Sequence, residues 1–345
     1  MSAQTNTVSP GANAAPVSAS VKMAAVNKKF RKIGIAMGII SGFTYGVFTV
    51  LAMVAGGYEP LAGAAFGGMA GILIVPYIST GLNDLIAGIW LTIYNAKDGR
   101  LPELGRSLNV FPGKIIVLGS LLGGPIANGA YLVGISLAGA YAIPISALTA
   151  LFAAVFGRIF LKQKITPRVM VGMLVCVAGA IIINITKPEG AQNFTLGVIF
   201  ALIAAVCWAL EGVASAYGGA MLESEVTVNL RQLISGVVCL FVILPIVGGM
   251  GLLGETLTAV TPVIWLALSG LGAAVSFLTW YKANAMVGVA IGMSLNVTYA
   301  FWGVLFAILF LGQPMTLTII VGSIIIVAGA ILVTMNPMDL FRKGE

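Results

Sequence analysis

Two acidic residues, Asp84 and Glu211, lie inside the long apolar segments of this sequence. A charged side chain at the centre of a bilayer costs roughly 2.5–3.5 kcal/mol on insertion scales, so such residues face the bundle interior and usually serve a function. Trp208 precedes Glu211 by three positions and shares its helix face. We therefore favour a functional carboxylate at Glu211 over a structural one that ties helices together. Asp84 lies closer to the outer end of its segment, and for this residue a functional role and simple hydration are equally good interpretations.

Aromatic and amide side chains could surround Glu211. The candidates are Tyr45, Trp280, Tyr281, Asn296, Tyr299 and Trp302. Asn296 and Tyr299 are three residues apart and share a helix face, which Trp302 continues. A carboxylate surrounded by rings suits a quaternary ammonium ion, because each ring face contributes roughly 0.5–2 kcal/mol to a desolvated cation. The alternative for any single ring is core packing or an interfacial belt, which we prefer for Trp265.

Membrane-spanning helices must position these residues. Apolar residues make up 59% of the chain and charged residues only 8%, whereas a soluble domain carries about 25% charged residues. Apolar runs occupy residues 33–55, 114–135, 140–160, 169–185, 195–220, 226–248, 261–286, 289–311 and 317–335. A helical span needs about 20 residues, while barrel strands alternate over about ten. The sequence thus predicts an all-α integral membrane protein with ten transmembrane helices.

The second of the ten spans is the least regular. Residues 57–96 are too long for one ordinary helix and awkward for two. If 61–77 and 78–96 both crossed, the basic loop at 97–114 would move to the outer side. We therefore place the span at 78–96 and interpret 57–77 as an insertion that is interfacial or re-entrant.

Basic residues set the orientation. They cluster at 22–32, 97–114, 158–168 and 342–343. With ten spans and a cytoplasmic amino terminus, all four clusters lie inside, as the positive-inside rule requires. Arg231 and Lys282 are expected near cytoplasmic helix ends. The net charge of +7 therefore reports topology in the plasma membrane (a bacterial inner membrane), with both termini cytoplasmic, rather than nucleic-acid binding.

The sequence contains an internal repeat. At a shift of 150, FLKQKIT (160–166) aligns with FLGQPMT (310–316), and VAGAI recurs at 177–181 and 327–331. At a shift of 148, LNDLIAG (82–88) aligns with LRQLISG (230–236). At a shift of 163 the first span aligns with the sixth, which places Tyr45 opposite Trp208. The difference of 15 residues falls within 57–77, which supports the insertion.

Two five-helix units, 33–187 and 194–336, follow from this repeat, after a disordered cytoplasmic tail at 1–30 that is rich in Ser, Ala, Asn and Pro. Because five spans are an odd number, the second unit enters from the opposite side. Inverted repeats place a substrate near the membrane midplane between the halves and permit alternating access. Pseudo-symmetric channels and scaffolds are the alternative, and we favour a transporter.

Several chemistries are excluded by composition. The chain has no histidine, so imidazole catalysis and His-containing metal sites are absent. Its three cysteines lie singly in different apolar runs. We expect no metal and no cofactor, and a membrane-embedded enzyme is the weakest hypothesis because two scattered acids make no catalytic constellation. The expected partners are the lipid bilayer and a small organic solute.

The repeat motifs resemble the drug/metabolite transporter superfamily with EamA-type repeats, over about residues 33–335. Segments 119–166, CWALEG (207–212) and LNVTYAFWGVLFAILFLGQP (295–314) resemble the LicB-type choline transporters within it. The resemblance implies choline uptake through a cation cage of Trp208, Glu211 and Tyr299, with Asp84 as the acid of span two. The chain departs from that pattern at Tyr45, Asn83 and Lys282, and an added cation near the site would favour a zwitterion. A transporter of amino acids or other metabolites, importing or exporting, is therefore the alternative.

Overall fold

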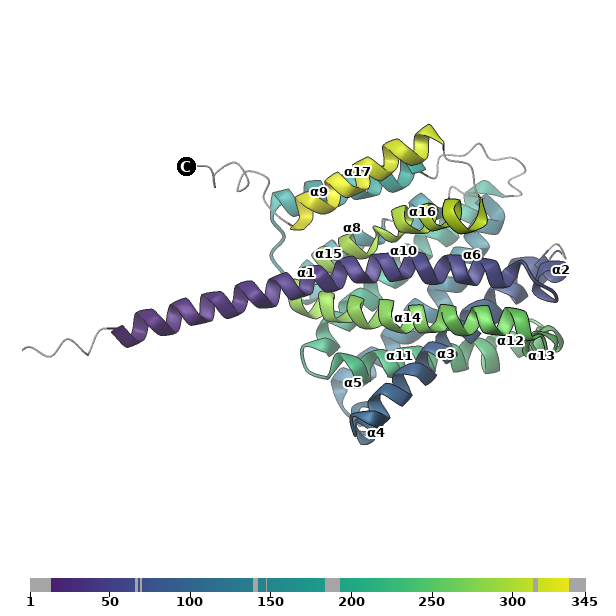
Figure 1. Ribbon diagram of the computed structural model, residues 1–345, viewed down its shortest axis with the longest axis horizontal. Coiled ribbons are helices and arrows are strands. Elements are labelled where there is room, and N and C mark those ends of the chain that lie inside the picture. The colour runs from purple at the N-terminus through teal and green to yellow at the C-terminus, as the bar shows by residue number, and fades with distance from the viewer. Residues whose placement is uncertain are drawn as a thin grey trace, which may run out of the picture.

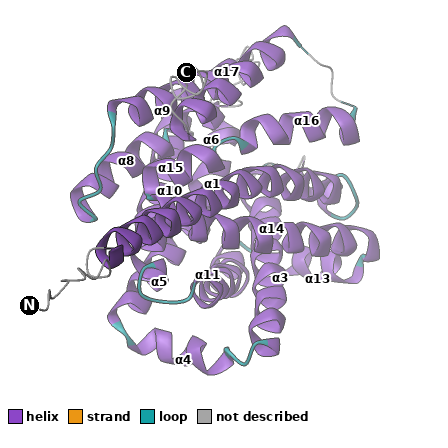
Figure 2. Ribbon diagram, turned by 60° about the vertical axis from the view of Figure 1, so that its left-hand side comes forward, coloured by secondary structure: helices purple, strands orange, loops and turns teal. Residues whose placement is uncertain are grey.

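The structure is a computed structural model that describes residues 14–65, 68, 70–138, 142–146, 148–183, 193–312 and 316–334. Within these ranges every regular element is a helix (Figure 2). The expected all-α membrane fold is therefore confirmed at the level of class. The disordered tail expected at 1–30 falls partly outside the described residues, and α1 already begins at Ala14.

Among the residues that the structure describes, six helical segments are long and apolar enough to cross a membrane. Three of them belong to single helices: Val26–Gly56 of α1 (Ala14–Gly56), α10 (Phe194–Gly219) and α14 (Val260–Val287). The segment Phe111–Gly134 joins α5 (Phe111–Leu121), η2 (Leu122–Ile126) and α6 (Ala127–Ala138), and the segment Ser224–Ile246 joins α11 (Ser224–Val238), η4 (Cys239–Ile243) and α12 (Leu244–Ile246). The segment Val289–Leu311 contains α15 (Val289–Asn296) and α16 (Tyr299–Leu311). Shorter apolar helices are α8 (Thr149–Phe160), α9 (Pro167–Ile183) and α17 (Leu317–Thr334). The five-residue helix α7 (Ala142–Ser146) precedes α8.

One further helix of spanning length, α3 (Val75–Lys97), follows α1 in the sequence and precedes the surface helix α4 (Leu101–Asn109). It carries Asn83 and Asp84 in its interior and is more polar than the six segments above. The described part of 57–77 holds the short helix α2 (Leu61–Ala65) and the π-helix η1 (Ala70–Ile74), which runs directly into α3. The helix α13 (Met250–Thr258) lies near α2 at the same end of the molecule (Figure 1).

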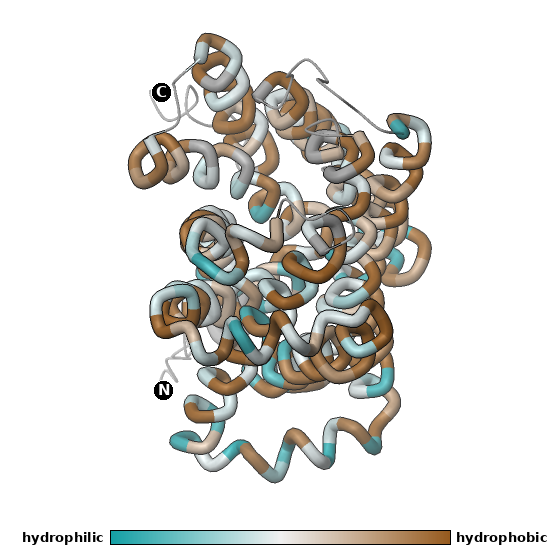
Figure 3. Tube along the Cα trace, turned by 90° about the vertical axis from the view of Figure 1, so that its right-hand side faces the viewer, coloured by the Kyte–Doolittle hydropathy of each residue, from teal (hydrophilic) through white to brown (hydrophobic). Residues whose placement is uncertain are grey.

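The long helices pack side by side in a bundle. α1 runs along α14, α10 lies against α6, α5 and α8, and α3 lies against α11 (Figure 1). α9 and α17 pair with each other along one edge of the bundle. Hydrophobic residues dominate the helices, while α4, the lowest helix in Figures 1 and 3, alternates between hydrophobic and hydrophilic residues. This distribution matches a bundle whose outer face meets lipid.

Close approach in the bundle depends on glycine. A Cβ atom on Gly179 would lie 2.7 Å from the carbonyl oxygen of Gly322, and one on Gly329 would lie 2.8 Å from that of Gly172. Small residues at such positions let helix backbones approach closely in membranes. The pairing of α9 with α17 is therefore fixed by these glycines.

Within the described part of the chain, three helices change to π-helical geometry beside a proline. η1 precedes Pro76, η4 precedes Pro245, and η2 contains Pro125. Because proline has no backbone N–H, the regular hydrogen-bond ladder cannot continue through it. Such π segments often mark functional sites, and η2 packs against α10 at Glu211.

Candidate functional site

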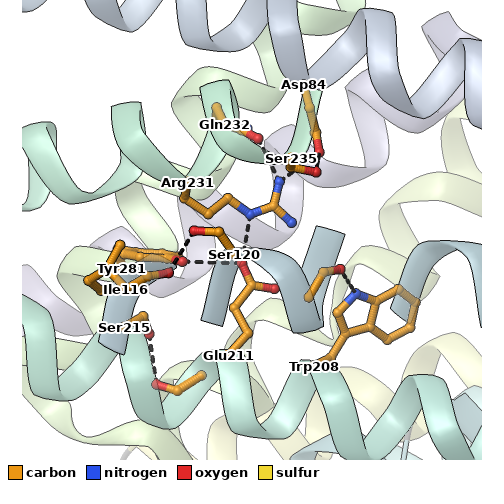
Figure 4. A network of polar contacts seen from close by, with 12 residues as sticks. Asp84, Ile116, Ser120, Trp208, Glu211, Ser215, Arg231, Gln232, Ser235 and Tyr281 are labelled. Carbon is orange, nitrogen blue, oxygen red and sulfur yellow. Dashed lines mark hydrogen bonds and ion pairs between the residues drawn. The ribbon is translucent and has the colours of Figure 1, made fainter. Parts of the chain in front are cut away.

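Arg231 lies in the interior of the bundle, fully buried. Its Nε donates a hydrogen bond to Glu211 Oε1 at 2.6 Å, and its Nη1 donates to Asp84 Oδ2 at 2.9 Å (Figure 4). The expectation that Arg231 sits near a helix end is wrong. It is the eighth residue of α11, about 10 Å along the helix from Ser224 at 1.5 Å per residue, and the two acids hold it inside.

Both predicted acids are therefore partners of one cation. Glu211 is fully buried in the middle of α10, and the hydroxyl of Tyr281 donates to its Oε1 at 3.1 Å. Asp84 is only 2% exposed and also accepts a hydrogen bond from the hydroxyl of Ser235. The structure thus excludes a merely hydrated Asp84. Two carboxylates and one guanidinium give this triad, Asp84–Arg231–Glu211, a formal charge of −1.

A small cavity of about 30 Å³ lies against Glu211. Six of the nine candidate site residues line it: Tyr45, Trp208, Glu211, Trp280, Asn296 and Tyr299. They come from α1, α10, α14, α15 and α16, so the structure brings together residues that are far apart in the sequence. A cavity of this size holds about one water molecule.

A larger cavity of about 340 Å³ lies next to the small one and shares Tyr45, Trp208 and Phe277 as wall residues. Asp84 and Tyr131 also line it. Its volume is at the lower end of the range for small-molecule sites, about 300–1,000 Å³. Among the described residues, Asp84 and Glu211 supply the charged groups that line these two cavities.

Ring contacts and one π-helical carbonyl hold the aromatic wall in place. The ring centroids of Tyr45 and Tyr299 are 4.4 Å apart, and those of Tyr131 and Trp208 are 5.2 Å apart. The indole Nε1 of Trp208 donates to the carbonyl oxygen of Gly123 in η2 at 3.0 Å (Figure 4). A Cβ atom on Gly123 would overlap Glu211 Oε2. Glycine there lets the carboxylate approach the backbone of η2 closely.

Three predicted features lie elsewhere. Tyr281 is buried behind Glu211 as its hydrogen-bond donor and is not among the residues that line the two cavities in the described part of the chain. Trp302 packs against Phe43, with ring centroids 5.0 Å apart, and is not among the described residues that line either cavity. Lys282 pairs with Glu225, at 2.6 Å, rather than with Glu211. Lys282 is therefore not the counter-charge of the cavity.

The internal repeat contained the signal that locates Arg231. In the alignment of LNDLIAG with LRQLISG, Arg231 falls opposite Asn83 and Gln232 opposite Asp84. Because Asp84 lies inside a span, its counterparts in the second unit must lie at a similar depth. Both Arg231 and Gln232 are indeed fully buried. Among the described residues, no group of three or more His, Cys, Asp or Glu side chains is placed to hold a metal ion.

Comparison with known proteins gives the family. The EamA-like transporter family matches residues 32–185 and again 195–335. Protein LicB of Haemophilus influenzae is 28% identical over 232 residues, which are 66% of this chain and 75% of that protein. An uncharacterized transporter of Clostridium kluyveri is 25% identical over 192 residues, 53% of this chain and 59% of that protein.

A solved crystal structure shares the fold, with a TM-score of 0.66 at 18% identity, over 87% of this chain and 97% of the matched chain. The two family matches together cover most of the 345 residues. The resemblance of the repeat motifs to the drug/metabolite transporter superfamily is thereby confirmed. This chain belongs to the EamA-like transporter family and is a multi-pass membrane transporter, not an enzyme.

Proposed function

We propose that this transporter moves a small organic monocation, choline or a related quaternary amine, into the cell by alternating access. The observation that carries the proposal is the buried triad of two acids and one guanidinium beside an aromatic cavity; with both acids ionised, the triad has a formal charge of −1. An uncompensated charge away from water is costly. A bound monocation would neutralise the triad, and the rings of Tyr45, Trp208 and Tyr299 would contribute cation–π attraction.

The geometry favours a cation over a zwitterion. The carboxylate of a zwitterion would need an accessible cation, but Arg231 lines neither described cavity and its guanidinium lies 4.0 Å from the centroid of the Phe277 ring. Lys282 is engaged by Glu225. Amino acids and other zwitterions remain the alternative cargo, and they would require Arg231 to turn toward the cavity.

Helix contacts support two inverted five-helix units. At the repeat shift of 150, Gly172 corresponds to Gly322 and Gly179 to Gly329. The close contacts join Gly172 to Gly329 and Gly179 to Gly322, so each contact maps onto the other when the units are exchanged. This reciprocity is typical of a two-fold axis, and it supports ten spans with the site between the halves.

The larger cavity lies toward the end of the bundle at which an importer would take up its cargo. Its wall includes Thr49 and Met53, late in α1, and Val75, at the start of α3. With ten spans and a cytoplasmic amino terminus, these helix ends lie on the outer side. Alternating access would then close this end and open the end where Lys282 pairs with Glu225.

Affinity measurements on purified protein test the proposal. Across a panel of quaternary amines, betaines and amino acids, choline-like cations should bind best. Glu211→Gln should weaken amine binding by about tenfold or more because it removes the net negative charge; Trp208→Leu should weaken it too, and Trp208→Phe less, because a ring face remains. Glu103→Gln, the same change on the surface helix α4, where the side chain is 45% exposed, is the control and should leave affinity within about twofold. Unchanged amine affinity in well-folded Glu211→Gln protein would contradict the proposal.

A further inference from the structure

An apolar groove lies on the surface of the bundle where α5, α8 and α10 meet. Its volume is about 360 Å³, and none of the described residues that line it carries a charge. Three of them, Phe111, Leu118 and Phe160, are 65%, 54% and 60% exposed. The groove is therefore open to the surroundings of the protein, which for a membrane-spanning bundle are lipid.

The floor of this groove is a close contact between α5 and α10. A Cβ atom on Gly119 of α5 would lie 2.7 Å from the Cβ atom of Ala214 on α10. The same Cβ atom would lie 3.8 Å from the Cα atom of Glu211. The rings of Phe111 and Tyr217, with centroids 6.4 Å apart, join the two helices again at one end of the groove. Whatever occupies the groove thus lies against the helix contact that carries Glu211.

The length of the groove matches one leaflet of a bilayer. On α5 its wall extends from Phe111 to Leu122, about 16 Å at 1.5 Å per residue. That is close to half of a hydrocarbon core of roughly 30 Å. Because α5 begins at Phe111 and α8 ends at Phe160, the groove runs from the helix ends toward the middle of the bundle. With the orientation expected from the basic residues, those ends are cytoplasmic, and an acyl chain of the inner leaflet fits this depth.

Basic side chains gather at the inner end of the groove. Lys114, on the first turn of α5, lies three positions after one groove residue and four before another, so it shares their helix face. Arg158 and Lys162 flank the groove residues at the end of α8. All three side chains are exposed, and within the described part of the chain none of them forms an ion pair. The sequence has no acidic residue between Glu103 and Glu189. This charge pattern fits an anionic lipid headgroup.

Lys162 also has a backbone conformation that normally favours glycine. Its φ is +52°, and at the repeat shift of 150 its counterpart is Gly312, whose φ is +65°. Residues with a side chain rarely adopt such angles, whereas glycine does so readily. The turn by itself would be served better by glycine, as it is in the second unit. The lysine therefore points to a role for its side chain.

We propose that this groove binds one anionic phospholipid of the inner leaflet, with an acyl chain along α5 and α10 and the headgroup against the basic side chains at the inner end. The chain would cover apolar surface that is otherwise exposed and would support the contact of α5 with α10 behind Glu211. Each basic side chain near the headgroup should contribute about fivefold in affinity. This site is separate from the cargo, so it does not depend on the proposed function.

Native mass spectrometry of delipidated protein tests the headgroup. With equal amounts of phosphatidylglycerol and phosphatidylcholine of identical acyl chains, the first lipid bound to wild-type protein should be mainly phosphatidylglycerol. Lys162→Gly should reduce this preference about fivefold. It should leave the melting temperature of the lipid-free protein unchanged or slightly raised, because glycine suits the backbone there. Lys28→Gln, which removes an exposed charge on the extension of α1 away from the bundle (Figure 1), is the control and should keep the preference.

Filling the groove tests the acyl chain. Leu118→Trp should weaken both lipids without changing the preference between them, and it should remove most of the rise in melting temperature that phosphatidylglycerol gives the wild type. Leu174→Trp, the same change at a 50% exposed position of α9, is the control and should keep both effects. Glycerol phosphate, which has the headgroup charge but no chain, should neither stabilise the protein nor displace the lipid.

Four outcomes would overturn the proposal. Equal binding of the two lipids by wild-type protein would remove the anionic headgroup, and so would an unchanged preference in Lys162→Gly. Unchanged lipid binding in Leu118→Trp would place the lipid elsewhere. Stabilisation by glycerol phosphate equal to that by the lipid would assign the basic residues to a free anion. A delipidated dimer that Leu118→Trp dissociates would assign the groove to a second copy of this chain. No transported substrate enters these measurements, so they stand apart from the tests of cargo.

Discussion

Replacing Arg231 with glutamine should be among the most damaging single substitutions in this protein. The side chain is fully buried between two carboxylates that are themselves at most 3% exposed, at 2.6 and 2.9 Å. Its removal leaves two acids close together without a cation. Breaking a buried ion pair by removing one partner costs about 3–5 kcal/mol, and a second orphaned carboxylate places Arg231→Gln at the upper end of that range.

Thermal unfolding of purified protein in lipid-supplemented detergent measures this effect. Arg106→Gln is the matched control, because Arg106 pairs with Glu103 at 2.7 Å but is 76% exposed. Exposed pairs contribute about 0–1 kcal/mol, so this variant should unfold close to the wild type. The difference between the two variants isolates the effect of burial.

A triple variant separates lost attraction from stranded charge. Adding Asp84→Asn and Glu211→Gln to Arg231→Gln removes every charge of the triad, and a neutral set of similar volume should recover much of the lost stability. The reasoning would be refuted by an Arg231→Gln protein within about 1 kcal/mol of the wild type. A triple variant less stable than the single one would refute it equally.

Three further predictions concern other parts of the molecule. Lys282→Met should leave the affinity for a cation within a few-fold, since its ion pair lies away from both cavities; a switch of preference between cation and zwitterion in a binding assay would contradict this. Gly123→Ala should displace Glu211 Oε2, which a Cβ atom at position 123 would overlap, and should weaken amine binding about tenfold. Gly105→Ala is the control, because a Cβ atom there meets open space; amine affinity and melting temperature should stay the same or improve slightly. Reporter fusions after residue 106 should read cytoplasmic and those after 190 external; the same side for both would remove the inverted-repeat argument.

Helix spacing and the repeat predicted part of the cavity walls, chiefly around the small cavity. Trp208 and Glu211 share a face because they are three residues apart on one regular helix, α10. Tyr45 was expected from its equivalence to Trp208, and it lines both cavities. Such arguments apply where the helix is continuous, because its period then fixes the face.

Spacing could not predict features that depend on helix breaks or on contacts between helices. α15 ends at Asn296 and α16 begins at Tyr299, so the face shared with Trp302 is interrupted, and Trp302 packs against α1 at Phe43 instead. The ion pair between Asp84 and Arg231 joins positions 147 residues apart. A pattern of neighbouring residues cannot reveal a contact between positions so far apart in the sequence. Only the repeat alignment indicated that Arg231 lies deep inside its helix.

Uptake by proteoliposomes under an imposed membrane potential tests the central claim most directly. A monocation that crosses without a coupling ion gains about 2.3 kcal/mol per 100 mV, and each tenfold gradient costs about 1.4 kcal/mol. Labelled choline should therefore accumulate up to roughly fortyfold at 100 mV, negative inside, and Glu211→Gln should abolish most of this uptake at limiting concentrations. Choline uptake that ignores the potential, or no uptake of any quaternary amine by folded protein, would contradict the account.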